Sequence, residues 1–212
     1  IFIPAIYNGY SPIFFAIITT IFSSLVTIYF TVGMNKKFIV ALLGVTSGVL
    51  IAGILSYIFT YRMRLNGFLD SDLLASAYLL KNVKIKELIP AGVIIGSLGA
   101  VMDVAVSITS SINELHETDP NMSKKSMFKS AINIGNDIIG TMINTLILAY
   151  IASSIFTLLL IYIQANEYPL IRILNFQDIA VEIMRSICGS IGILIAVPLT
   201  AYIGTLIYKK KK

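Results

Sequence analysis

Residues 38–61 read FIVALLGVTSGVLIAGILSYIFTY and contain no charged side chain. A helix of about 20 apolar residues crosses a bilayer whose hydrocarbon core is about 30 Å thick, so this stretch is long enough to span a membrane. Four other stretches have the same character. The five predicted spans cover residues 12–33, 38–61, 88–112, 134–163 and 186–208. The sequence therefore predicts an all-α protein, a polytopic membrane bundle of about five transmembrane helices.

The composition agrees with a membrane protein. The chain has 212 residues, of which 57% are hydrophobic and 13% charged, and its mean hydropathy is +0.86. Soluble domains carry about 25% charged residues, so this chain has too few to cover a water-soluble body, and we expect it to contact the lipid bilayer. Its net charge of +5 comes from short basic clusters between apolar runs. A nucleic-acid partner is not expected, because such sites gather basic residues on one folded face.

The links between the spans differ in length and polarity. The link at residues 62–87 is the longest before the third span, and Asp70 and Asp72 interrupt its apolar middle at residues 68–80. Because that middle is too short and too polar to cross the bilayer, we expect a short amphipathic helix on the membrane surface. The chain is treated as a single transmembrane domain, 1–212. It begins at Ile1 instead of Met and shows no signal-peptide pattern there, so we expect a preceding segment to be missing.

The distribution of basic residues predicts an orientation. Five spans place the two ends of the chain on opposite sides of the membrane. If the tail at residues 209–212 is cytoplasmic, the larger group of basic residues is cytoplasmic too. Apart from the tail, that group is Lys36, Lys37, Lys124, Lys125 and Lys129. Basic residues favour the cytoplasmic side, so the C-terminus is predicted to lie in the cytoplasm.

Polar residues in the last three spans recur at helical spacing. In the third span Asp103, Ser107, Ser110 and Glu114 are separated by four, three and four positions, which places them on one helical face. In the fourth span the corresponding face carries Asn133, Asp137, Thr141, Asn144 and Thr145. The fifth span opens with Arg185 and Ser186, followed by Ser190. We expect these three polar faces to turn inward toward one another.

Asp103 is the first candidate for chemistry within the membrane. A charge at the bilayer centre costs at least about 2.5–3.5 kcal/mol, so this carboxyl must face protein or water. It could bind and release a proton, as a transport relay does, or it could only hydrogen-bond across helices to Thr141 or Asn144. Asp137 is a second relay candidate, although a negative charge near a helix N-terminus is also favourable on its own. Both alternatives stay open for each residue.

The remaining residues do not indicate an enzyme. The sequence contains no phosphate-binding glycine loop, nucleophile elbow or metal motif. His116 is the single histidine and is expected in a solvated loop, without a partner at metal-ligand spacing. Cys188 lies in an apolar run and is expected to be a small buried residue. No enzymatic activity, cofactor or metal is therefore predicted. Gly44, Gly48 and Gly53 in the second span indicate either close helix packing or ordinary tolerance of glycine.

Two longer stretches resemble a known family. Residues 92–108, GVIIGSLGAVMDVAVSI, and residues 135–150, GNDIIGTMINTLILAY, together with Glu114-Leu-His116, resemble the YibE/YibF-like family of bacterial multi-span membrane proteins. The resemblance covers essentially the whole chain. It implies a bacterial plasma-membrane protein. It also implies an earlier N-terminal span and an extracytoplasmic domain, and we expect both to be missing from this sequence.

A more distant resemblance is to SecF and the RND-type permeases. Those proteins also have a hairpin of two spans, a span with an Asp, a cytoplasmic link and two further spans. Asp103 in the run MDVAVSI stands where SecF-like proteins have Asn-Asp-Thr-Val-Val-Val. This likeness implies that Asp103 couples proton flow to movement. The SecF-type run Asp-Arg-Ile-Arg-Glu-Asn is not matched, since Ser-Ile-Asn113-Glu114-Leu stands in its place.

Two functions follow as hypotheses. The first is a permease-like protein for proton- or ion-coupled transport or export, acting through Asp103. The second is a non-transporting membrane scaffold or subunit that anchors a partner protein, with the polar faces serving as interhelical hydrogen bonds. Partners on either hypothesis are other membrane subunits or a homo-oligomer. A water-filled cavity at Asp103 would favour transport, and a dry core between the last three spans would favour the scaffold.

Overall fold

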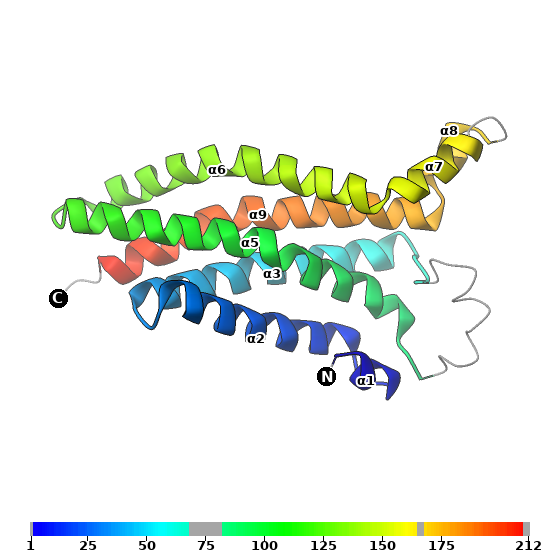
Figure 1. The fold of residues 1–212 in the computed structure, drawn as a ribbon, viewed down its shortest axis with the longest axis horizontal. Helices are drawn as coiled ribbons and strands as arrows, with labels where there is room; N and C mark the ends of the chain where they lie inside the picture. Colours follow the sequence, from blue (N-terminus) through cyan, green and yellow to red (C-terminus); the bar gives the residue numbers. More distant parts are fainter. Residues whose placement is uncertain (1, 68–81, 165–167, 210–212) are drawn as a thin grey trace.

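The computed structural model describes residues 2–67, 82–164 and 168–209, and every regular element in them is a helix. Five helices are long and apolar enough to cross a membrane, which confirms the all-α fold with five spans. They lie side by side along the long axis of the molecule (Figure 1). In chain order the helices are α1 (Phe2–Tyr7), α2 (Pro12–Val32), α3 (Lys36–Arg62), α5 (Ile85–Thr118), α6 (Lys124–Ser153), α7 (Ile155–Gln164), α8 (Leu170–Leu174) and α9 (Gln177–Tyr208).

Short polar signals begin and end the long helices. The Ser11 hydroxyl accepts a hydrogen bond from a backbone N–H in the first turn of α2. Gly33, with a φ of 75°, ends α2, and the Asn35 side chain caps the start of α3. These three residues produce the tight hairpin between the first two spans. Ser123 caps α6 in the same way after the turn that follows α5.

Three helices extend beyond the apolar windows that predicted them. The α5 helix runs past both ends of the expected span 88–112, and α9 begins nine residues before the expected 186–208. The α6 helix starts ten residues before the expected 134–163 and breaks at Ser154. Helix ends that carry polar side chains project beyond the hydrocarbon layer, so an apolar window does not detect them. The surface helix expected at residues 68–80 lies outside the described residues.

The centre of the bundle is formed by α3, α5 and α9. A Cβ built on Gly48 of α3 would lie 2.7 Å from Val101 Cγ1 on α5 and 2.8 Å from Ala196 Cβ on α9. A Cβ built on Gly192 would lie 2.9 Å from Ala52 Cβ. Small residues let membrane helices approach this closely, so the glycines of the second span serve close packing.

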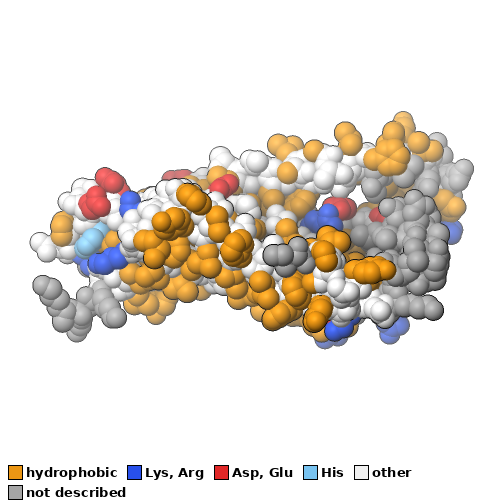
Figure 2. All heavy atoms as spheres, turned by 60° about the horizontal axis from the view of Figure 1, so that its bottom comes forward, with side chains coloured by type: hydrophobic (Ala, Val, Ile, Leu, Met, Phe, Trp, Pro, Cys, Tyr) orange, Lys and Arg blue, Asp and Glu red, His pale blue; other side chains and the backbone are white. Residues whose placement is uncertain are grey.

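The two outer helices of the bundle expose different surfaces. Exposed positions of α2 are apolar for most of its length, and Phe30 is 81% exposed. Figure 2 views the bundle from the α2 side and shows apolar side chains spread over that face. Such a surface suits direct contact with lipid. The α6 helix lies at the opposite edge (Figure 1) and has the least buried window of the five spans.

Candidate functional site

The polar residues of α5 share one face, as their spacing predicts, but this face points outward. Asp103, Ser110 and Glu114 are exposed and Ser107 is half-buried. The opposite side of the helix is fully buried and includes Ile108, in the same cluster as residues of α3 and α9. The expectation that this face turns inward is therefore wrong. The other side of α5 carries mostly β-branched and small residues, which pack against the neighbouring helices.

The polar face of α6 is also turned outward. Its five predicted residues are all exposed, namely Asn133, Asp137, Thr141, Asn144 and Thr145. The buried positions of α6, which include Gly135 and Leu146, face the rest of the bundle. The hydroxyls of Thr141 and Thr145 donate to carbonyl oxygens of α6 itself, each at 2.9 Å. Within the part of the chain that the structure describes, neither Thr141 nor Asn144 donates to Asp103.

The two carboxyls lie at similar depth. A Cβ built on Gly135 of α6 would lie 3.4 Å from Ile108 Cδ1 on α5, which sets the register of this antiparallel helix pair. Asp103 is five residues before Ile108, and Gly140 is five residues after Gly135. At 1.5 Å per residue, Asp137 is therefore about 4.5 Å from the depth of Asp103. Both carboxyls lie near the middle of their helices.

We call this surface the α5–α6 polar face. It consists of Asp103, Ser107, Ser110 and Glu114 on α5 with Asn133, Asp137, Thr141, Asn144 and Thr145 on α6. The buried sides of both helices belong to the core that contains α9, so both polar rows point away from α9. The face is therefore one continuous surface on the outside of the single chain.

A groove opens on this face near the turn between α5 and α6. Its volume is about 460 Å³. The lining residues are Ser110, Ser111, Glu114, Leu115, Thr118, Met122 and Ile134. Asp103 lines neither this groove nor the cavity between α6, α7 and α9. Its surroundings in the single chain are therefore an open surface and not an enclosed pocket.

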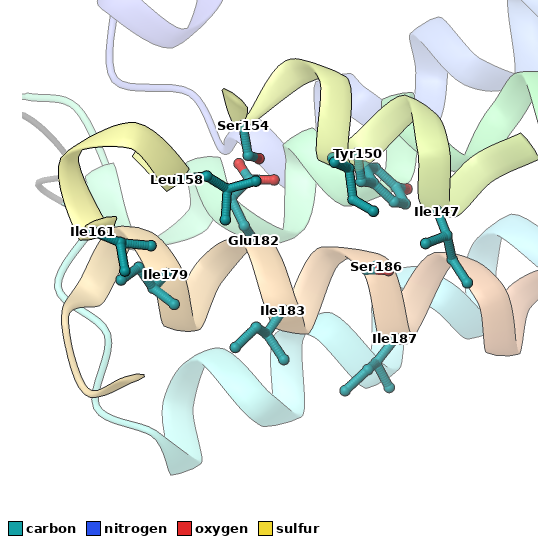
Figure 3. A pocket seen from close by; sticks show the side chains of 11 residues that line it. Ile147, Tyr150, Ser154, Leu158, Ile161, Ile179, Glu182, Ile183, Ser186 and Ile187 are labelled. Atoms are coloured by element: carbon teal, nitrogen blue, oxygen red, sulfur yellow. The ribbon is translucent and has the colours of Figure 1, made fainter. Parts of the chain in front are cut away.

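A second cavity, of about 270 Å³, lies between α6, α7 and α9. Isoleucine and leucine side chains form most of its wall, with Tyr150, Ser154, Glu182 and Ser186 as the polar members. Figure 3 shows Glu182 pointing from α9 toward Ser154, at the break between α6 and α7. The cavity is therefore apolar with a few polar groups, which is the usual character of a small-molecule site.

The polar start of α9 forms an ion pair beside this cavity. Arg185 Nη1 lies 2.8 Å from Glu182 Oε1, and the two side chains are 28% and 27% exposed. Arg185 Nε, the second Glu182 oxygen and the Tyr150 hydroxyl have no hydrogen-bond partner in the described part of the chain. Of the other predicted polar residues of this span, Ser186 lines the cavity and Ser190 is half-buried. Glu182 and Tyr150 were not predicted, although Glu182 stands three positions before Arg185, a spacing at which helical side chains meet.

His116 is not in a solvated loop. It belongs to the last turn of α5, and its ring stands edge-on to Tyr208 with 5.4 Å between centroids. The Tyr208 hydroxyl donates to Asn113 Oδ1 at 2.9 Å. The helix continues to Thr118, so the His116 side chain packs against the end of α9. Cys188 is buried, as expected. Among the described residues, no cluster of three His, Cys, Asp or Glu could hold a metal ion.

Five long apolar helices, a lipid-compatible outer surface and interlocking glycines define a polytopic helical membrane protein. Residues 1–210 match the model of the family described as YibE/F-like protein, and the chain belongs to that family. The resemblance of residues 92–108 and 135–150 to this family is thereby confirmed. No curated protein and no solved structure matches the chain. The likeness to SecF and RND-type permeases stays a prediction.

Proposed function

We propose that this chain is a permease-like protein of the bacterial plasma membrane, with its C-terminus in the cytoplasm, that moves protons or ions along the α5–α6 polar face. The observation that carries the proposal is the pair Asp103 and Asp137, two exposed mid-helix carboxyls at similar depth. Ionisable residues inside membranes are costly and mark ion pathways or proton relays in many proteins. Asp103 and Asp137 are the relay groups in this proposal.

The other residues of the face suit the same role. A carboxyl binds and releases a proton, while hydroxyl and amide side chains both donate and accept hydrogen bonds. From Glu114 to Asp103 the row covers eleven residues, or about 16 Å along the helix. Groups spaced about a helical turn apart need water between them to pass a proton. Because the face is open on one side in the single chain, the path requires a second surface to enclose it.

The alternative is a membrane scaffold or subunit that anchors a partner protein. The closely packed glycines between α3, α5 and α9 and the position of Asp103 outside both cavities favour it. On this alternative the polar face supplies hydrogen bonds to the partner, each worth about 0.6 kcal/mol. Neither role involves catalysis or a cofactor.

Proton flux into vesicles tests the proposal. The purified full chain is reconstituted with an internal pH dye, and a potassium diffusion potential drives the flux. We expect Asp103→Asn to lower the rate at least about tenfold, because the amide cannot release a proton. Asp103→Glu, which keeps a carboxyl, should retain part of the rate. Asp119→Asn is the matched control, since Asp119 lies at the end of α5, beyond the spans.

The outcomes separate the two roles. A wild-type rate for Asp103→Asn removes this carboxyl from the mechanism and leaves Asp137 as the relay. If Asp103→Asn and Asp137→Asn both conduct like the wild type, the polar face does not carry protons. Vesicles in which the wild type itself conducts neither protons nor alkali cations leave the scaffold as the function.

A further inference from the structure

The exposed surface of the bundle is divided into two kinds. Along α2 the exposed side chains are mostly apolar and suit lipid. On the α5–α6 polar face the exposed side chains are carboxyls, amides and hydroxyls. Polar groups inside a membrane are stable when they face protein or water. The α5–α6 polar face is therefore the surface that another protein helix is expected to cover.

The glycines divide in the same way. A Cβ built on Gly48, Gly53 or Gly192 would lie less than 3 Å from an atom of a neighbouring helix. In contrast, a Cβ built on any of four other helical glycines meets nothing within 4 Å: Gly92, Gly96 and Gly99 on α5, and Gly140 on α6. In this bundle, tightly packed glycines mark the places where helices meet. The four open glycines belong to the same side of α5 and α6 as the polar residues.

Three pairs of residues on this side of α5 and α6 carry groups that suit each other at one depth, whereas Asp103 is level with Gly140. Ile108 on α5 and Gly135 on α6 lie at the same depth. Because the helices are antiparallel, Glu114, six residues after Ile108, is level with Lys129, six residues before Gly135. By the same register Ser110 pairs with Asn133, and Gly99 pairs with Asn144. An acid is thus level with a base, a hydroxyl with an amide, and a glycine with a larger polar side chain.

Glu114 and Lys129, although at the same depth, do not form an ion pair within one chain. Glu114 and Lys129 are both exposed, and the ion pairs found in the described part of the chain are Lys84–Glu87 and Glu182–Arg185. Both rows point outward from the bundle, so their side chains are directed away from the core instead of across the helix pair. Complementary groups that remain unpaired in the single chain are available to a second surface.

A two-fold axis parallel to the helices brings the rows together. Such an axis keeps every residue at its own depth and lays α5 of one chain against α6 of the other. Glu114 then meets Lys129 of the partner subunit, and the same contact occurs a second time across the axis. A two-fold interface is self-complementary in this sense, because each patch must contain both members of every pair.

We propose that a second copy of this chain covers the α5–α6 polar face, forming a symmetric dimer with α5, α6 and their two-fold mates at its centre. Charge complementarity selects a second copy, since Glu114 of the face and Lys129, exposed one helical turn before Asn133, supply an acid and a base at one depth. An unrelated helix would have to match both rows separately. The dimer stands independently of the transport proposal, because the need to cover polar groups does not depend on proton movement.

Disulfide cross-linking between separately tagged chains tests the arrangement. One chain carries Ser110→Cys and the other Asn133→Cys, both with Cys188→Ala, and they are co-expressed in membranes and oxidised. We expect a dimer band that carries both tags. Phe22→Cys, on the lipid-facing side of α2, replaces Ser110→Cys in the matched control and should give no such band. Cross-linking at Phe22 alone would overturn the proposed interface.

A charge exchange tests the pairing of α5 with the partner's α6. Glu114→Lys and Lys129→Glu chains should each self-associate about tenfold more weakly than the wild type, measured by energy transfer between labelled chains in lipid vesicles. Mixed together, the two variants should associate nearly as well as the wild type, because both contacts across the axis again join opposite charges. Lys86→Glu, at the other end of α5, is the control and should not change association.

The results identify the occupant of the face. A wild-type chain that stays monomeric at every protein-to-lipid ratio overturns the dimer. Association that neither charge variant weakens places the interface elsewhere and also overturns it. A dimer without proton flux removes the proposed transport function and leaves the dimer intact. Flux through a chain that stays monomeric overturns the dimer and shows that the proton path needs no second surface.

Discussion

Gly48→Leu is expected to disrupt the packing of the bundle. A Cβ at this position would already lie 2.7 Å from Val101 Cγ1, 2.8 Å from Ala196 Cβ and 3.1 Å from the Gly192 carbonyl oxygen. The Ala196 Cβ and the Gly192 oxygen on α9 cannot rotate away, and Val101 approaches from the other side, on α5. Overpacking a tight core costs about 1–3 kcal/mol and sometimes more. We expect the melting temperature in detergent to fall by about 10 °C.

An alanine pair provides the matched control. Gly48→Ala adds one methyl group to the crowded site, and Gly96→Ala adds the same group where nothing lies within 4 Å. Alanine favours a helix over glycine by about 1 kcal/mol, so Gly96→Ala should be neutral or slightly stabilising while Gly48→Ala lowers the melting temperature. Equal effects at the two positions would show that α3 does not approach α5 and α9 as closely as described.

The fold was largely predictable because each membrane-spanning helix requires a long run of apolar residues, which hydropathy detects directly. Each of the five spans was located from a run of apolar residues. The boundaries of α6 were not predictable from hydropathy. Six of its first ten residues are polar, including Lys125 and Lys129, and the Ser123 hydroxyl caps its first turn. The break at Ser154 has no signal in hydropathy, because apolar residues continue on both sides.

The candidate site was predictable only in part. Spacing placed Asp103, Ser110 and Glu114 on one helical face, because 3.6 residues per turn is a property of every α-helix. The direction of that face was not predictable, since it depends on which side of α5 packs better against α3 and α9. The assumption that polar residues turn inward treats the single chain as complete. In the proposed dimer the polar face points out of each single chain and is covered by the second copy.

Removing one partner of the Glu182–Arg185 pair is expected to destabilise the protein more than removing both. Each side chain is less than a third exposed, and the cavity beside Glu182 is mostly apolar. Arg185→Met leaves a carboxylate without its cation, and Glu182→Gln leaves the guanidinium without its anion. Stranding a buried charge costs about 3–5 kcal/mol, and partial exposure reduces this to about 2 kcal/mol for each single variant.

The double variant distinguishes the loss of the whole ion pair from the loss of one partner. Glu182→Gln with Arg185→Met removes both charges and should cost less than either single change, as measured by reversible unfolding in mixed micelles. Lys84–Glu87 is the matched control, because it has the same spacing but a distance of 4.0 Å and a lysine that is 56% exposed. Lys84→Met should therefore change the unfolding free energy by less than about 0.5 kcal/mol.

Equal costs for Arg185→Met and Lys84→Met would contradict the description of the cavity. The loss of unfolding free energy caused by an unpaired charge is smaller when water reaches that charge. A small cost would mean that water enters between α6, α7 and α9 and hydrates Glu182 directly. A large cost with recovery in the double variant would mean that the pair holds the start of α9 against Tyr150 in a dry site. The same pair of measurements therefore distinguishes a hydrated opening beside α9 from a sealed one.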